Sequence, residues 1–146
     1  MKVIFKTFSE LTTKELYQIL QLRSEVFVVE QNCVYQDIDG KDEKAIHIIG
    51  VAQNKIVAYT RCFKPGEYFK EASVGRVVVK KTERKLKRGN QIMIHSIKAI
   101  EKLFQTKTII ISAQSHLIPF YNNLGFYSVG IEYLEDGIPH IEMIKK

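Results

Sequence analysis

The stretch from 74 to 104 constrains the fold of this chain most, because it predicts a strand, a basic loop and a helix in direct succession. The strand has its apolar core at 75–79, the loop 80–88 reads KKTERKLKR, and a helix follows Gly89, with an apolar stripe of Met93, Ile97, Ile100 and Phe104. Free N–H groups at the start of such a helix, beside basic side chains, favour an anion. The loop matches neither the P-loop pattern nor G-x-G-x-x-G, so folds built on those motifs are not expected.

The other periodic segments place this unit in a mixed α/β domain that spans 1–146. The predicted strands are 2–8, 45–51, 55–63, 73–80, 108–112 and two within 129–144, and the other predicted helices begin near 12 and 115. Thr12 and Glu15 have the spacing of a capping box. Turns are expected at Gln53-Asn54 and at 135–137, which reads EDG. The order of elements predicts one sheet packed by helices.

The positive charge of the chain is concentrated in one short segment. The formal net charge is +6, and the loop 80–88 contributes +5 of it, with six Lys or Arg residues against Glu83. A protein that binds duplex DNA spreads its basic residues over a face, and a binder of single strands interleaves aromatic residues among them. A compact polyanion, such as a group of phosphates, fits this loop better than a nucleic acid does.

Size and cysteine content favour a cytoplasmic protein without disulfides. A chain of 146 residues buries enough surface to fold without a disulfide or a metal. No apolar run approaches 18 residues, and the start, MKVIFKTFSE, has no signal-peptide pattern, so no membrane segment is expected. Cys33 and Cys62 lack zinc spacing and an activating neighbour, and are therefore expected to be reduced thiols.

The segment Arg84-Lys85-Leu86-Lys87-Arg88-Gly89 resembles the pyrophosphate loop of the GNAT (Gcn5-related) N-acetyltransferases, whose usual pattern is Q/R-x-x-G-x-G/A. The resemblance extends over nearly the whole chain and narrows to the ElaA-like branch. The segments that carry it are 22–31 (LRSEVFVVEQ), Tyr35…Asp39…Asp42…His47, Arg61, 75–79 (GRVVV), 113–126 (AQSHLIPFYNNLGF) and 135–143 (EDGIPHIEM). Lys87 stands at the first glycine of the loop pattern, so it must adopt an allowed φ there, and it adds a charge to the phosphate site.

The resemblance implies a GNAT fold, which has a mixed, mostly antiparallel, twisted sheet of about six to seven strands, about four helices and a V-shaped splay at the cofactor strand. It implies acetyl-CoA as co-substrate and no metal. The cofactor strand would bind the pantetheine arm and the acetyl carbonyl through Val77, Val78 and Val79. The pyrophosphate would be held by Arg84, Lys87, Arg88, Gly89, Asn90 and Gln91. Gln114 would also contact the cofactor, and Tyr121 would be the general acid.

The general base stays open between bulk water and three side chains, which are also candidates for the acceptor pocket: Glu30, His47 and His140. The acidic loop 37–42 does not fit an EF-hand, because Gly40 is not at the sixth position. We therefore expect no metal site there. Arg23 interrupts the apolar stripe of the first helix and is expected to pair with an acid.

These features favour an N-acetyltransferase that uses acetyl-CoA and a small-molecule or peptide amine. The amine would attack the thioester directly in a ternary complex, without an acetyl-cysteine intermediate. The alternatives are a module of the same fold that binds CoA or an acyl-CoA without transfer, and a nucleic-acid binder that uses 80–88. Neither a nucleic-acid nor a membrane partner is expected, and a homodimer is left open.

Overall fold

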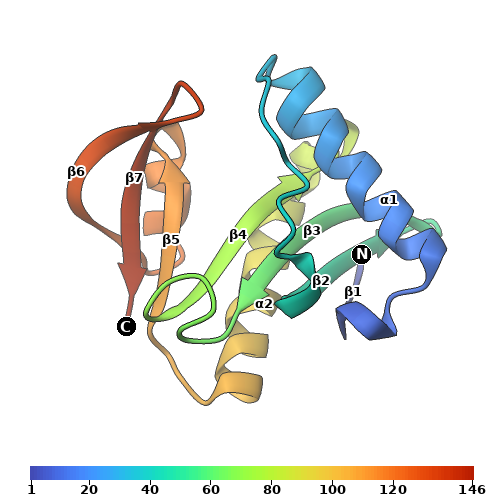
Figure 1. The fold of residues 1–146 in the computed structure, drawn as a ribbon, viewed down its shortest axis with the longest axis horizontal. Helices are drawn as coiled ribbons and strands as arrows, with labels where there is room; N and C mark the ends of the chain where they lie inside the picture. The colour runs from blue at the N-terminus through green and yellow to red at the C-terminus, as the bar shows by residue number, and fades with distance from the viewer.

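The computed structural model describes every residue from Met1 to Lys146 and contains one seven-stranded sheet of order β1-β2-β3-β4-β5-β7-β6 (Figure 1). The strands are β1 (Lys2–Thr7), β2 (Ile46–Ala52), β3 (Lys55–Phe63), β4 (Ala72–Val79), β5 (Ile109–Gln114), β6 (Tyr127–Glu135) and β7 (Ile138–Lys145). Every neighbouring pair is antiparallel except β4 and β5, which are parallel. The mixed α/β fold class and the order of elements predicted from the sequence are confirmed.

Two longer helices and several short ones accompany the sheet. The α-helices are α1 (Thr13–Arg23), α2 (Arg88–Phe104) and α3 (Ile118–Asn122). A π-helical segment, η2 (Ser24–Glu30), continues α1, and the 3-10 turns are η1 (Phe8–Glu10), η3 (Asp42–Lys44), η4 (Lys81–Leu86) and η5 (Ser115–Leu117). The capping box at the start of α1 is present, with Glu15 N–H donating to Thr12 Oγ1 at 3.0 Å. The predicted start of this helix is therefore confirmed.

The helices α1 and α2 lie on opposite faces of the sheet (Figure 1). Successive residues of a strand point to opposite faces, so Ile48 and Ala58 pack in the core under α2, whereas Ile49 and Tyr59 pack in the core under α1. The core under α2 also extends to β5, β7 and α3. The sheet between the two helices is thus covered on both sides, which is what a strand such as β3, buried along most of its length, requires.

The sheet splits between β4 and β5. Only two register pairs join these strands, Ala72 with Ile109 and Ser73 with Ile110, and beyond them the strands diverge (Figure 1). On its other side β4 has a bulge, because Tyr59 pairs with Val78 while Arg61 pairs with Gly75. Arg76 has a φ of +47° within this bulge. The V-shaped splay expected at the cofactor strand therefore opens along the second half of β4.

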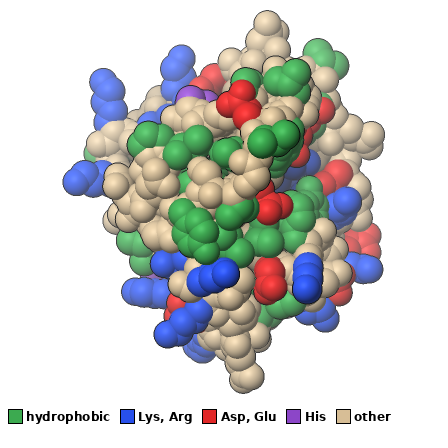
Figure 2. Space-filling model, turned by 90° about the vertical axis from the view of Figure 1, so that its left-hand side faces the viewer, with side chains coloured by type: hydrophobic (Ala, Val, Ile, Leu, Met, Phe, Trp, Pro, Cys, Tyr) green, Lys and Arg blue, Asp and Glu red, His purple; other side chains and the backbone are tan.

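The strand β6 forms an exposed edge of the sheet. Nearly all its residues are exposed, including the large apolar side chains Ile131 and Leu134. Figure 2, which faces this end of the molecule, shows hydrophobic and acidic side chains over its middle and most Lys and Arg side chains toward its margins. A bulge at Gly130 interrupts the pairing with β7 between Val129 and Tyr133. None of the helices has the length and apolar character that crossing a bilayer requires.

Candidate active site

A large cavity of about 860 Å³ lies in the splay between β4 and β5, within the size range of small-molecule and cofactor sites. Its walls come from β4, η2, the start of α2 and the η5–α3 segment. The predicted site residues that line it are Glu30, Val77, Val78, Val79, Arg84, Lys87, Gly89, Asn90, Gln114 and Tyr121. Arg88 and Gln91 do not line it. The guanidinium of Arg88 contacts Glu83 instead, with Nη2 3.4 Å from Oε1.

The start of α2 carries the features of an anion site. Lys87 is the N-cap residue, its φ is +57°, and no side chain caps the helix. The first N–H groups of an uncapped helix are left to solvent or to a ligand. Lys87 thus has the left-handed backbone conformation that glycine adopts without steric cost. Its side chain adds a full positive charge at the helix terminus.

Arg84 is fixed beside this terminus by an ion pair with Glu30. Both terminal nitrogens of the guanidinium donate to the Glu30 carboxylate, and Nε donates to the carbonyl of Val79 at 3.1 Å. The hydrogen bonds from Arg84 hold the pKa of Glu30 below its ordinary value. Glu30 is thus occupied as an acceptor for Arg84, which argues against its candidacy as the general base.

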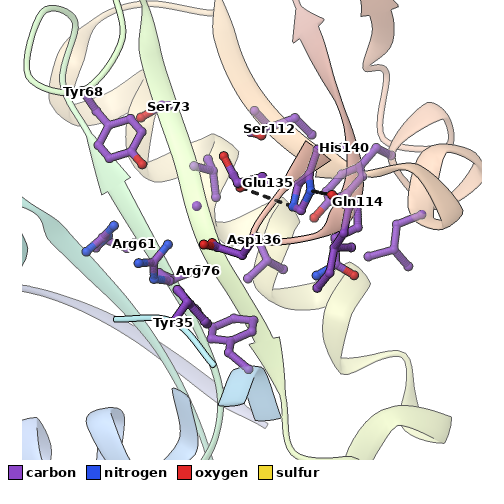
Figure 3. A pocket seen from close by; sticks show the side chains of 18 of the residues that line it. Tyr35, Arg61, Tyr68, Ser73, Arg76, Ser112, Gln114, Glu135, Asp136 and His140 are labelled. Atoms are coloured by element: carbon purple, nitrogen blue, oxygen red, sulfur yellow. Dashed lines mark hydrogen bonds and ion pairs between the residues drawn. The ribbon is translucent and has the colours of Figure 1, made fainter. Parts of the chain in front are cut away.

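A smaller cavity of about 150 Å³ adjoins the large one (Figure 3). The two cavities share seven lining residues, which are Phe27, Gln31, Val77, Gln114, Leu117, Tyr121 and Ile138. The remaining walls of the small cavity come from the loop after η2, from β3 and β4, and from the β6–β7 hairpin. A ligand in each cavity would therefore meet the other at a junction formed by β4, β5 and α3.

Tyr121 lies at this junction and is 5% exposed. Its ring packs edge-on against Phe120 and Phe126, at centroid distances of 5.0 and 6.0 Å. Its hydroxyl makes no hydrogen bond to the rest of the chain, and burial raises its pKa above the ordinary value. The group is therefore a protonated donor at neutral pH that faces both cavities without a protein partner.

His140 lines the small cavity next to Gln114, with which it pairs in register. Its Nδ1 lies 2.7 Å from the carbonyl oxygen of Ile138, so Nδ1 must carry a proton and donate. In the neutral ring Nε2 is then an acceptor, and it lies 3.3 Å from Oε2 of Glu135. This geometry suits a residue that receives a proton.

His47 is placed differently from the expectation of a base or pocket residue. Its side chain is wholly buried and lines neither cavity. Its ring nitrogens contact the Tyr59 hydroxyl at 2.7 Å and the Asp42 carbonyl at 3.0 Å, and burial lowers its pKa. Both nitrogens are engaged within the fold, so the contacts indicate a structural role.

The acidic loop binds arginines. The guanidinium groups of Arg23, Arg61 and Arg76 are paired with the carboxylates of Asp37, Asp39 and Asp42. Arg23 is 0% exposed and pairs with two of these acids, as the sequence predicted. Burial acts to raise the pKa of Asp39, but hydrogen bonds and the charge of Arg61 outweigh it and hold the pKa well below its usual range.

Several residues of the small cavity were not assigned from the sequence. The polar ones among them are Gln31, Tyr35, Arg61, Tyr68, Ser73, Arg76, Ser112, Glu135 and Asp136. Tyr35, Arg61 and the 135–143 segment belong to the stretches that carry the family resemblance, but nothing in their local sequence gives them a role. Glu135 and Asp136 were interpreted only as turn residues, although the EDG turn brings both carboxylates to the cavity.

Comparisons with known proteins identify close relatives over nearly the whole chain. A family model described as an acetyltransferase (GNAT) domain matches residues 9–146. The ElaA protein of Escherichia coli K12 is 43% identical over 140 residues, which are 94% of this chain and 92% of that protein. The crystal structure of Escherichia coli ElaA matches with a TM-score of 0.92 over 99% of each chain.

Two further relatives extend this similarity. An acyl-CoA N-acyltransferase from Pseudomonas aeruginosa has a TM-score of 0.93 and 40% identity, and the match covers 100% of both chains. A UPF0039 protein of Schizosaccharomyces pombe is 40% identical over 145 residues, covering 98% of this chain and 95% of that one.

Proposed function

Because this chain belongs to the GNAT acetyltransferase family, we propose that it transfers the acetyl group of acetyl-CoA to a primary amine by direct attack in a ternary complex. The observation that carries the proposal is the junction of the two cavities at Val77, Gln114 and Tyr121. The large cavity takes the cofactor and the small cavity takes the amine. Their shared wall is where an acetyl group would meet a nucleophile.

The phosphate end of the cofactor is assigned to the start of α2. Lys87 and Arg84 supply charge, and the backbone at Gly89 and Asn90 supplies N–H donors in the first helical turn. The pantetheine arm then follows the free side of β4 from Val79 toward Val77. Arg88 is a weaker candidate for binding the phosphates, because its guanidinium contacts Glu83 outside the cavity.

The chemistry needs an oriented amine, a stabilised oxyanion and a donor for the leaving thiolate. The nitrogen lone pair forms the new C–N bond as the C–S bond breaks. The edge of β4 that faces the splay is unpaired with β5 beyond Ser73, and it supplies backbone N–H groups for the oxyanion beside Val77. Tyr121 donates to the departing thiolate sulfur. Since its pKa is raised and that of a free thiol is about 8.5, complete transfer is uphill and hydrogen bonding supplies much of the stabilisation.

Nε2 of His140 accepts the proton that the attacking amine loses. The carbonyl of Ile138 fixes the tautomer that leaves this nitrogen as the acceptor, and the ring lines the small cavity. Glu135 contacts the same nitrogen and would stabilise the imidazolium once it forms. Glu30 is assigned to holding Arg84, and His47 to holding the loop that ends in Asp42.

The proposal is tested by a thiol-release assay with acetyl-CoA over a panel of monoamines, diamines, amino acids and peptides. We expect turnover on at least one amine and an N-acetyl product of matching mass.

The double Cys33→Ser, Cys62→Ser variant should keep turnover, because burial raises the pKa of Cys62 to about 12 and no activating base accompanies either thiol. CoA binding without turnover on any amine would favour a sensor that binds CoA, and a stoichiometric acetyl-cysteine would contradict direct attack.

A further inference from the structure

One wall of the small cavity is electrically balanced. Arg61 and Arg76 line the cavity there. Together with the buried Arg23 they pair with Asp37, Asp39 and Asp42, which lie outside the lining, at N···O distances from 2.7 to 3.5 Å. The guanidinium groups of Arg61 and Arg76 also stack on aromatic rings, over Phe63 and Tyr35 at 5.1 and 5.5 Å from their centroids. The cations of this wall are thus compensated within the fold and leave no net charge for a ligand.

The facing wall carries two carboxylates without a cationic partner from Lys or Arg. Glu135 and Asp136 line the cavity from the tip of the β6–β7 hairpin (Figure 3). Glu135 contacts only His140, at 3.3 Å, and Asp136 forms no ion pair. The formal charge that the cavity leaves uncompensated is therefore negative, two charges from this hairpin against a balanced opposite wall.

The hairpin tip is held over the cavity by its own geometry. Asp136 has a φ of +53° and Gly137 a φ of +77°, the combination that a two-residue turn needs. The carbonyl oxygen of Asp136 accepts from the Cys33 thiol at 3.5 Å, which ties the tip to the loop on the other side of the cavity. The two carboxylates are therefore positioned by backbone contacts that do not depend on a ligand.

Two hydroxyl groups at the same cavity have no protein partner. The Tyr121 side chain is 5% exposed and Ser73 is 2% exposed, and neither hydroxyl makes a hydrogen bond to the rest of the chain. Neither oxygen is among the fully buried atoms that lack a partner, so both stay accessible and can bond a ligand or water. The small cavity thus has unmatched hydrogen-bonding groups at one end and unmatched negative charge at the other.

We infer that the acceptor is a short amine with a second positive charge, whose non-reacting ammonium is held at the hairpin tip by Asp136 and attracted by the negative charge of Glu135, while its reacting amine lies toward His140, Tyr121 and Gln114. This inference rests on the proposed acetyl transfer and names its substrate class. The cavity volume, about 150 Å³, is that of an engineered cavity that holds one benzene molecule, so a chain of a few carbons fills it. Short aliphatic diamines meet both conditions.

Three probes of equal chain length test the charge requirement: 1,4-diaminobutane, butylamine and 4-aminobutanoate, whose far ends are positive, neutral and negative. We expect kcat/KM for acetylation at low ionic strength to fall in that order, with the diamine about tenfold above butylamine. Added salt should narrow this ratio, because Glu135 and Asp136 are both exposed.

The ratio of diamine to butylamine is then measured in the double variant Glu135→Gln, Asp136→Asn. We expect the ratio to fall to about two or less. Glu132→Gln is the matched control, because Glu132 is an exposed carboxylate on the same strand that lines neither cavity, and it should keep the parent ratio. Using a ratio removes any common loss of rate through the contact between Glu135 and His140.

The possible results distinguish a failure of this inference from a failure of the proposed acetyl transfer. Equal turnover of diamine and butylamine, or a ratio that the double variant leaves unchanged, overturns the inference while acetyl transfer stands. A preference for 4-aminobutanoate would assign the cavity to zwitterions that reach Arg61 and Arg76, and would also overturn it. Turnover confined to other amines without a second positive charge has the same consequence. No turnover on any amine overturns the proposed function and this inference together.

Discussion

The two cavities that meet at Tyr121 are built in different ways. Most of the charged wall of the large cavity comes from one continuous stretch, from Val77 to Asn90, in which a strand, a loop and a helix follow one another. The small cavity is assembled from separate segments between Phe27 and His140. The proposed phosphate site is recognisable from a local motif, whereas the proposed acceptor site depends on how distant loops meet.

The largest effect is expected at the junction itself. Tyr121→Phe removes only the hydroxyl, so we expect kcat to fall by roughly 10²-fold while CoA affinity changes by less than about threefold. Tyr127→Phe, which removes an exposed hydroxyl on β6, is the control and should resemble the parent. Steady-state kinetics on a confirmed amine and CoA titration measure the two quantities. Parental turnover in Tyr121→Phe, with chemistry shown to be rate-limiting, would remove Tyr121 as the acid.

The wall of the small cavity that holds the paired arginines should contribute more to the stability of the fold than the facing β6–β7 hairpin does. Asp39→Asn removes a carboxylate that contacts two nitrogens of the buried Arg61 guanidinium, each at 2.8 Å. Because Arg61 keeps its contact with Asp42, we expect a loss of about 2 kcal/mol in the free energy of unfolding at pH 7. Glu43→Gln changes an exposed neighbouring carboxylate and should cost less than about 0.5 kcal/mol. Denaturant titration measures both.

The same pair predicts a pH dependence. The folded pKa of Asp39 is depressed, so its stabilising contribution is complete above the unfolded pKa of about 3.9 and is lost as the pH falls below it. The stability difference between the parent and Asp39→Asn should therefore shrink between pH 7 and pH 3. A difference that stays constant over this interval would mean that the carboxylate charge is not what stabilises Arg61.

Lys87→Glu should act on the large cavity alone. We expect CoA affinity to fall by more than tenfold, because a favourable charge at the phosphate end becomes a repulsive one, while a pantetheine fragment without phosphates keeps its affinity. Lys98→Glu makes the same change farther along α2 and should have little effect, and Arg88→Glu should weaken CoA less than Lys87→Glu does. Calorimetric titration provides the comparison. Equal losses of CoA affinity in all three variants would indicate a general electrostatic attraction rather than a direct contact with the phosphates.

The smallest effect separates the backbone of Lys87 from its charge. Lys87→Gly relieves a left-handed conformation but adds freedom to the unfolded chain, so we expect the free energy of unfolding to change by less than about 0.5 kcal/mol. CoA affinity should fall by about threefold, since the glycine keeps the helix terminus and loses one cation. An affinity above that of the parent would show that the lysine side chain obstructs the site.

Local chemistry made the fold and the large cavity predictable. The capping box at Thr12 and Glu15, the turn at Gln53 and Asn54, and the strand–loop–helix unit each depend on neighbours in sequence, and the structure contains all of them. The family resemblance added the splay, which no single segment predicts. Lys87 could be named in advance from the basic segment before the helix, whereas Val77 and Tyr121 were named only through the family resemblance.

The small cavity was harder to predict because its groups interact across long sequence separations. Arg61 and Asp39 are 22 residues apart, and Cys33 and Asp136 are 103 apart. His47 was one of the open candidates for the base or the acceptor pocket, but the fold places its ring between the Tyr59 hydroxyl and the backbone carbonyl of Asp42. Whether a polar side chain faces a cavity or is matched in the core depends on its partners, and sequence periodicity does not specify those.

The two register pairs between β4 and β5 have a consequence for motion. Amide hydrogen exchange follows the opening of cooperative units, and a sheet joined by so few backbone pairs at its middle has a natural boundary there. The three-stranded unit β5–β7–β6 should exchange with its own opening free energy, distinct from that of β1–β4. A molecule that spans both walls of the splay would connect the units, so adding CoA should slow exchange in β7 as well as in β4. Bound CoA would then add a contact across the sheet to the two register pairs and the shared core under α2.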